Sequence, residues 1–354
     1  TATTEIYTLP LHDALPISGV MLAFVFMPSR KRDGPLPVFD WTGLILVIVF
    51  VAAVLTGMSS GQREGWGAPI ISVYFSVAAI SAVAFVAWEL TTPDPIMQLR
   101  LFKNSNFAAA AVVGMVLGAG LFGSIYVVPL FVQTIQNYSP TRSGILMVPG
   151  GIVMMMAFPI AGYFSDKLPS YQMVLFGLFV FGASSLLMIQ VHTDTPFWTF
   201  AIWIMIGRVG LAAIMPTLTI SAVATLRPEQ LSQGAGAINF TRQLGGAVGV
   251  NLMAMMLERR TAFFSDAFAG LQTPDNFTAM HLMTQFARTL GQLGWPLEMT
   301  PAGALYLVGR SVYAQASMMA FRDVFLFIAL VYFATMIPAL LLRKRKPKAM
   351  AQPL

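Results

Sequence analysis

The stretch LRPEQLSQGAGAINFTRQLGGAVG, residues 226–249, is hydrophobic enough for a membrane helix but carries polar side chains in its interior. A proline and an acid near its start suit the first turn of a helix. At 100° per residue, one face of that helix collects small and polar residues with an arginine at its edge: Gly236, Asn239, Gln243 and Gly246, with Arg242 beside them. Such a face must point toward protein or water rather than lipid. The sequence therefore predicts a helix that packs or lines a cavity inside a membrane protein.

The composition of the whole chain supports this interpretation. Of its 354 residues, 56% are hydrophobic and 10% are charged, and the mean hydropathy is +0.72. Soluble domains have about 25% charged residues. The absence of cysteine excludes disulfides, zinc–thiolate sites and thiol catalysis. The net charge of +6 comes from Lys and Arg in short loops, which indicates cytoplasmic loops and no nucleic-acid binding.

Apolar runs predict an all-α polytopic membrane protein with about eight transmembrane helices, since each run approaches the ~20 residues that a bilayer requires. The expected spans are 39–60, 69–90, 107–128, 144–164, 171–190, 197–224, 226–257 and 324–342. Alternating the sides brings most basic residues to one face, which the positive-inside rule makes cytoplasmic, together with the basic C-terminal tail 343–354. Residues 258–322 then form a long outside loop, in which 277–293 is amphipathic and predicts an interfacial helix.

The start of the chain is interpreted separately. Residues 1–18 lack the layout of a signal peptide and resemble the translation of a sequencing adapter, with an ordinary amphipathic leader as the alternative. Residues 19–38 are expected to hold the end of a truncated helix and a basic cytoplasmic loop. Functional interpretation therefore begins after residue 18.

Two arginines lie inside predicted spans. Arg208 is deep in the sixth span, where a cation costs ~2.5–3.5 kcal/mol and should face a partner or a wet cavity. The alternative is an arginine that only braces packing through backbone carbonyls. Arg242 lies nearer the cytoplasmic end of its helix, so snorkelling toward the cytoplasm is its alternative. With Asn239 and Gln243, the two arginines are the candidate cavity residues.

Glycines and one acid complete the set of candidate residues. Small residues four apart let neighbouring membrane helices approach closely, which assigns helix packing to Gly114, Gly118, Gly245, Gly246 and Gly249. Gly162, Asp166 and Lys167 end the fourth span at its cytoplasmic side, where Asp166 can pair with a helix N-terminus as lobes move. A solvated loop acid is the alternative there. No residues assemble a metal site or a catalytic triad in the sequence.

Several motifs in order resemble one family. They are FDWTG from Phe39, LRLFKNSNF from Leu99, GRVG from Gly207, NFTRQLGGAVG from Asn239 and QASMMAFRDVF from Gln315. Together they resemble the 14-helix drug:proton antiporters of the major facilitator superfamily, the EmrB/QacA branch. The resemblance implies that residues 39–92 are two extra central helices and 93–342 the C-terminal six-helix lobe. Gly162 and Asp166 match the family's cytoplasmic Gly-x-x-x-Asp-Arg motif, but Lys167 replaces its arginine.

The resemblance implies a C-terminal part of a proton-driven multidrug exporter of a bacterial inner membrane, with a cytoplasmic C-terminus. Its partners would be hydrophobic or cationic drugs, protons, the lipid bilayer and a periplasmic adaptor of the EmrA type. It implies no bound cofactor, because the proton gradient supplies the energy. In the layout that the resemblance implies, the N-terminal lobe is not part of this sequence, so the chain is not expected to transport alone. The alternative is a membrane-embedded scaffold or enzyme subunit; no cluster of ionisable groups favours an enzyme.

Overall fold

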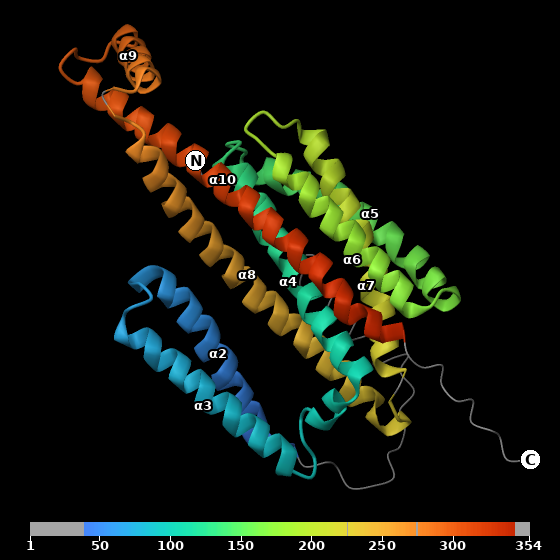
Figure 1. Ribbon diagram of the computed structural model, residues 1–354. Coiled ribbons are helices and arrows are strands. Elements are labelled where there is room, and N and C mark those ends of the chain that lie inside the picture. Colours follow the sequence, from blue (N-terminus) through green and yellow to red (C-terminus); the bar gives the residue numbers. More distant parts are fainter. Residues whose placement is uncertain (1–38, 225, 274, 344–354) are drawn as a thin grey trace, which may run out of the picture. The chain divides into compact units, whose positions relative to one another are not determined.

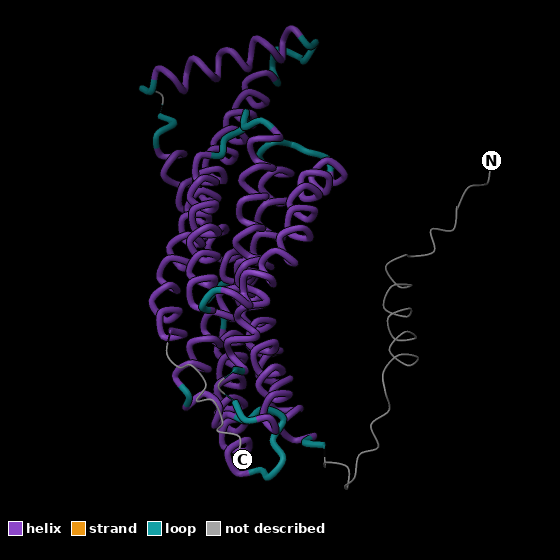
Figure 2. Tube along the Cα trace, turned by 90° about the vertical axis from the view of Figure 1, so that its right-hand side faces the viewer, coloured by secondary structure: helices purple, strands orange, loops and turns teal. Residues whose placement is uncertain are grey.

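The computed structural model describes residues 39–343 except residues 225 and 274. Almost all of them belong to one compact unit that begins at Asp40. The predictions for residues 1–38 and for the basic tail after residue 343 lie outside the described residues. Every described element is helical (Figures 1 and 2), as the composition predicts.

Nine α-helices make up the described part of the chain. They are α2 (Trp41–Glu64), α3 (Pro69–Thr91), α4 (Ser105–Thr134), α5 (Pro140–Lys167), α6 (Ser170–Leu187), α7 (Phe197–Val223), α8 (Leu231–Gly270), α9 (Phe277–Gln292) and α10 (Thr300–Ala339). Four short 3-10 helices join them: η1 (Leu99–Lys103), η2 (Met188–Gln190), η3 (Pro228–Gln230) and η4 (Leu340–Arg343). All eight predicted spans have a helix at their position.

Seven of the described helices are long and apolar enough to cross a membrane, and α8 is the long helix that is not among them. This differs from the expected number of about eight spans. The difference falls on the helix that contains residues 226–249, because α8 carries Asn239, Arg242 and Gln243 and then three charged residues, 258–260. A helix of that composition is stable in a membrane only when protein or water covers its polar face.

The expected outside loop 258–322 is largely helical, and its location outside the membrane stays a prediction. Helix α8 continues to Gly270 and α10 begins at Thr300, so only residues 271–299 connect them. Charges at 258–260 mark where a chain leaves an apolar environment, but they do not end a helix, and no proline interrupts α8. The amphipathic helix expected within this region is confirmed as α9, which lies crosswise to the long helices in Figure 2.

Aromatic packing holds the helices of the main bundle together. Phe131 of α4 is fully buried, and its ring centroid lies 5.7 Å from that of Phe200 on α7. It also lies 5.2 Å from Phe321 and 6.5 Å from Phe325, both on α10, in edge-to-face arrangements. Such pairs contribute about 0.5–1.5 kcal/mol each beyond the area they bury. One side chain therefore ties three helices that are far apart in sequence.

Helices α2 and α3 form a hairpin that touches the rest of the unit through α8. The Gln62 side-chain amide donates to the Asn251 carbonyl at 3.3 Å. The Arg259 guanidinium lies over the Trp66 ring, 4.9 Å from its centroid. Both contacts join the turn end of the hairpin to the middle and the C-terminal half of α8, and Figure 1 shows the hairpin beside α8.

Candidate functional site

Helix α8 is positioned by its close approach to α4. A Cβ added to Gly118 would lie 1.9 Å from the carbonyl oxygen of Arg242, and one added to Gly245 would lie 2.1 Å from that of Met115. Gly249 meets Ala119 in the same way, and Gly246 meets the Phe122 ring. Backbones at this distance leave no room for a side chain, which is the arrangement that small residues four apart permit. Gly114 differs, because its nearest neighbour, Leu218, is at an ordinary 3.6 Å.

The polar residues of α8 lie on the face that this contact leaves uncovered. Asn239 and Gln243 are exposed and Arg242 is half-buried, whereas Gly246 is buried against α4. The Arg242 guanidinium donates to the Asn239 side-chain oxygen at 2.6 Å, one turn away on the same helix. The structure therefore brings Asn239, Arg242 and Gln243 together as one surface, and separates Gly246 from them.

Arg208 lies elsewhere, inside the bundle. Its side chain is 7% exposed, and Gly150 of α5 leaves space for it: a Cβ there would lie 3.2 Å from the Arg208 Cγ. Within the described residues, the Arg208 guanidinium forms no hydrogen bond or ion pair. It lines a small cavity with residues of α4, α5, α6 and α10, and none of α8. Arg208 and the polar surface of α8 are therefore not one cluster.

Tyr332 of α10 packs against Phe181, which lines the small cavity of Arg208. Tyr332 is 1% exposed, its ring centroid lies 4.3 Å from that of Phe181 in a tilted arrangement, and its hydroxyl has no hydrogen-bond partner among the described residues. Two serines of α6, Ser184 and Ser185, line the same small cavity. Their hydroxyl groups donate to the carbonyls of Trp203 and Phe181, so they are already paired. A buried cation without a partner is costly in a membrane bundle, which is why such residues mark functional sites.

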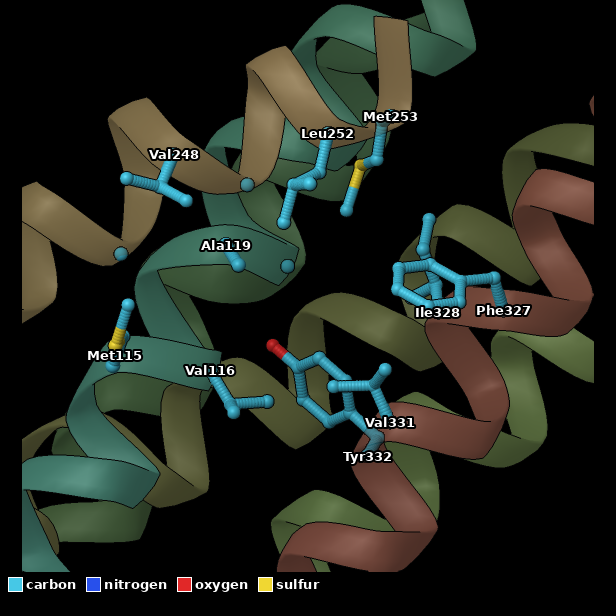
Figure 3. Close-up of a pocket in the computed structure, with 13 residues that line it drawn as sticks. Met115, Val116, Ala119, Val248, Leu252, Met253, Phe327, Ile328, Val331 and Tyr332 are labelled. Atoms are coloured by element: carbon cyan, nitrogen blue, oxygen red, sulfur yellow. The ribbon is translucent and has the colours of Figure 1, made fainter. Parts of the chain in front are cut away.

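A cavity of about 270 Å³ follows the seam between α4, α8 and α10. Figure 3 shows its walls: Met115, Val116 and Ala119 from α4, Val248, Leu252 and Met253 from α8, and Phe327, Ile328, Val331 and Tyr332 from α10. The Tyr332 hydroxyl is the one polar group drawn in this close-up, and it points toward α4. An apolar chamber with a single polar group suits a hydrophobic ligand.

A larger cavity, of about 780 Å³, lies farther along the same seam. Its lining includes both aromatic and charged residues: the rings of Tyr126, Tyr313 and Phe321, the Glu258 carboxylate and the Arg310 guanidinium. Ligand sites for drug-sized molecules have volumes of about 300–1,000 Å³ and few polar groups. Tyrosine rings and a carboxylate together can hold an organic cation.

This outer cavity was missed at the sequence level. The predicted seventh span ended at Leu257, one residue before Glu258. A signal was present, because the lining residues of α8 recur at helical spacing as Ala254, Leu257, Glu258, Thr261, Ala262 and Ser265. Their continuous face crosses the expected boundary between membrane and loop.

The candidate gating residues lie at the end of α5. Asp166 and Lys167 are exposed, and the Lys167 ammonium lies over the Tyr163 ring, 4.1 Å from its centroid, with its nitrogen hydrogen-bonded to the Tyr163 hydroxyl. Asp166 forms no ion pair with a described residue. A Cβ at Gly162 would meet nothing within 4 Å. The described hydrogen bonds and ion pairs link none of these three residues to another helix, so their gating role stays a prediction.

A metal-dependent site finds no support among the described residues. No group of three or more His, Cys, Asp or Glu side chains lies close enough there to hold a metal ion. The described residues offer instead an apolar seam between α4, α8 and α10, two cavities along it, and a third, smaller cavity that Arg208 lines. That combination can bind and release small molecules by changes in helix packing.

Comparison with known proteins agrees with this chemistry. Residues 17–250 match the family model of the Major Facilitator Superfamily. The chain is 26% identical to the "Uncharacterized MFS-type transporter YhcA" of Bacillus subtilis, over 97% of this chain and 66% of that protein. It is 25% identical to the "Colistin resistance protein EmrB" of Acinetobacter baumannii, over 90% of this chain and 63% of that protein.

A third relative is more similar over a shorter stretch. The "Multidrug resistance protein B homolog" of Mycobacterium tuberculosis is 32% identical over 68% of this chain and 45% of its own length. The chain thus spans less than two thirds of the length of these relatives. The family model covers more than half of the chain, and the described residues form an all-helical bundle with seven candidate membrane spans. This multi-pass membrane protein therefore belongs to the Major Facilitator Superfamily, a family of transporters and not of enzymes.

Proposed function

We propose that this chain is the C-terminal part of a proton-coupled exporter of hydrophobic or cationic small molecules in a bacterial inner membrane. The observation that carries the proposal is the exposed polar surface of α8, formed by Asn239, Arg242 and Gln243. Helix α8 lies between α4 and α10 in the bundle, so its uncovered face belongs to the interior of a larger assembly rather than to lipid. A second lobe facing it would close a central cavity, and rocking of the lobes would alternate access.

The substrate class follows from the two cavities along the α4–α8–α10 seam. The inner chamber is apolar, and the outer cavity adds aromatic rings and the Glu258 carboxylate. A hydrophobic molecule fits the first, and a molecule with a delocalised positive charge fits the second. The names of two relatives, a colistin resistance protein and a multidrug resistance protein homolog, support export of toxic compounds as the direction.

Coupling to protons is proposed from the family resemblance and is tested separately from substrate binding. The complete reading frame that contains this chain is expressed in a drug-sensitive bacterial host. Efflux of a fluorescent cation is then measured with and without a protonophore. We expect efflux that the protonophore abolishes. Efflux that persists without a proton gradient would contradict proton coupling, and no efflux with any of a panel of cationic and neutral compounds would favour a scaffold.

Arg208 provides the sharpest variant. Arg208→Gln removes the buried cation, and we expect at least a tenfold loss of efflux at unchanged membrane abundance. Arg63→Gln is the matched control, since Arg63 is an exposed arginine at the end of α2. Equal efflux by the two variants would remove Arg208 from the transport machinery.

Glu258→Gln tests the outer cavity. It keeps the shape of the side chain but removes the charge that attracts a cation, so resistance to cationic compounds should fall more than resistance to neutral ones. Glu298→Gln is the control, because Glu298 is an exposed acid in the connection between α9 and α10. Equal losses for both substrate classes would show that Glu258 does not select for charge.

A further inference from the structure

Two buried acids meet at one end of the α2–α3 hairpin, away from the cavities described above. Asp40 precedes α2 and caps it: its Oδ1 accepts the backbone N–H of Gly43 at 2.8 Å. The same Oδ1 accepts the indole N–H of Trp88, on α3, also at 2.8 Å. A carboxylate that receives two hydrogen bonds at a helix N-terminus is stabilised in its charged form.

Glu89 belongs to the last turn of α3, next to Trp88. Its Oε2 accepts the backbone N–H of Met97 at 3.2 Å, which ties α3 to the connection that leads into α4. A negative charge at this end of a helix is disfavoured, since the helix dipole already places negative charge there. The two acids therefore occupy opposite electrostatic settings, one suited to a carboxylate and the other to a neutral carboxyl group.

The remaining oxygens of the two groups face the same point. Asp40 Oδ2 and Glu89 Oε1 lie 2.5 Å and 2.8 Å from the position that a Cβ on Gly43 would occupy. Both atoms are buried, and neither has a hydrogen-bond partner among the described residues. The two residues are 8% and 4% exposed, so neither carboxyl group lies open to bulk solvent. Buried oxygens without partners are rare in folded proteins and demand an explanation.

No described cation explains them. The charged residues of the neighbouring segments are Asp94, in the α3–α4 connection, and Arg100 and Lys103, in η1. All three are exposed, and none forms an ion pair with Asp40 or Glu89; α3 itself contains no basic residue. A metal ion would need more oxygen ligands than this pair offers, because hard cations take six or more.

We propose that Asp40 and Glu89 form a proton-binding site. One proton is bound to Glu89 Oε1, and this O–H group donates a hydrogen bond to Asp40 Oδ2. A single proton satisfies both oxygens at once, as an O–H···O⁻ hydrogen bond, and removes the repulsion between two buried anions. Gly43 matters for this site because a Cβ there would lie 2.5 Å from Asp40 Oδ2 and 2.8 Å from Glu89 Oε1, so at least one carboxyl group would have to move. This site does not depend on transport by the complete protein.

The proton links two parts of the chain. While the pair holds it, Glu89 keeps its hydrogen bond to Met97, and α3 stays tied to the start of the α4 connection. Loss of the proton would leave two neighbouring anions, and the Glu89 side chain would turn toward water. The site therefore couples proton binding to the attachment of the α2–α3 hairpin to the main bundle.

Infrared difference spectroscopy of the full chain, purified in lipid nanodiscs at neutral pH, tests the proposal. Spectra of wild type and each variant are subtracted in the region of the C=O stretch of protonated carboxyl groups. We expect a band that Glu89→Gln removes and that Asp40→Asn shifts or removes. Gly43→Ala, which keeps both acids but separates them, should shift the same band. Asp94→Asn is the control and should leave the band unchanged.

Other results would overturn the site. A wild-type protein without a protonated carboxyl band would mean that both acids are ionised, with a bound cation as the alternative. A band that is unaffected by Glu89→Gln, or by Asp40→Asn, would mean that the proton lies elsewhere. If Glu89→Gln fails to fold by circular dichroism, the Asp40→Asn and Gly43→Ala spectra still decide between these outcomes.

Discussion

Substitution of Gly118 by alanine tests the contact that positions α8. The added Cβ would lie 1.9 Å from the Arg242 carbonyl oxygen, about 1.4 Å short of the ~3.3 Å at which carbon and oxygen make contact. No side-chain rotation can relieve this contact, because the added Cβ would meet the backbone carbonyl of Arg242. Helices α4 and α8 must therefore separate, and overpacking of this kind costs about 1–3 kcal/mol. We expect the upper end of that range, because the separation also loosens the neighbouring contacts of Gly245 and Gly249.

Gly114→Ala is the matched control for this prediction. It lies one turn earlier on the same helix, where the nearest heavy atom is 3.6 Å from the added Cβ. The helix propensity of alanine favours both variants by up to about 1 kcal/mol, so Gly114→Ala should be neutral or stabilising. The assay is thermal unfolding of the purified full chain in one detergent at one scan rate, followed by circular dichroism. The reasoning is refuted if Gly118→Ala unfolds at the wild-type temperature, or if both variants are destabilised equally.

Two further predictions concern stability. Phe131→Ala should destabilise the chain by about 3–5 kcal/mol, because it empties a fully buried position shared by three helices. Phe179 is exposed, so Phe179→Ala should change stability by less than about 0.5 kcal/mol. Similar unfolding temperatures for the two variants would contradict the packing described. The ion pair between Arg260 and Asp323 joins α8 to α10 at 2.5 Å, but its side chains are 40% and 24% exposed. A double-mutant cycle with Arg260→Gln and Asp323→Asn should therefore give a coupling free energy of at most about 1 kcal/mol. This coupling should fall with added salt. A coupling that is larger and insensitive to salt would mean that the pair is buried in the membrane-embedded protein.

Much of the fold could be predicted from the sequence because membrane helices can be recognised by the length and hydropathy of their apolar segments. The spans around Phe107 and Phe197 needed no tertiary information, since roughly 20 apolar residues have one stable conformation in lipid. Helix ends were harder to predict. The charges at 258–260 indicate a membrane boundary, but helix propensity continues past them to Gly270.

The candidate site was only partly predictable. Periodicity places Asn239, Arg242 and Gln243 on one face of a helix, and the structure has them there. It does not tell which buried surface Arg208 meets, because that depends on packing among α5, α6 and α10. The partnership of Asp40 and Glu89 also escapes local patterns, since it joins residues from opposite ends of a hairpin.

The polar surface of α8 should face an aqueous cavity in the complete transporter. This sequence has no cysteine, so once any cysteine outside it has been replaced in the complete reading frame, a single cysteine at Gln243 gives an unambiguous probe, with one at Phe179 as a control on the exposed apolar face of α6. A thiol reacts with a charged, membrane-impermeant reagent only where water ionises it. We expect Gln243→Cys in the complete reading frame to be labelled at a high rate and to be protected by a transported cation, while Phe179→Cys is not labelled. Equal, slow labelling at both positions would contradict it.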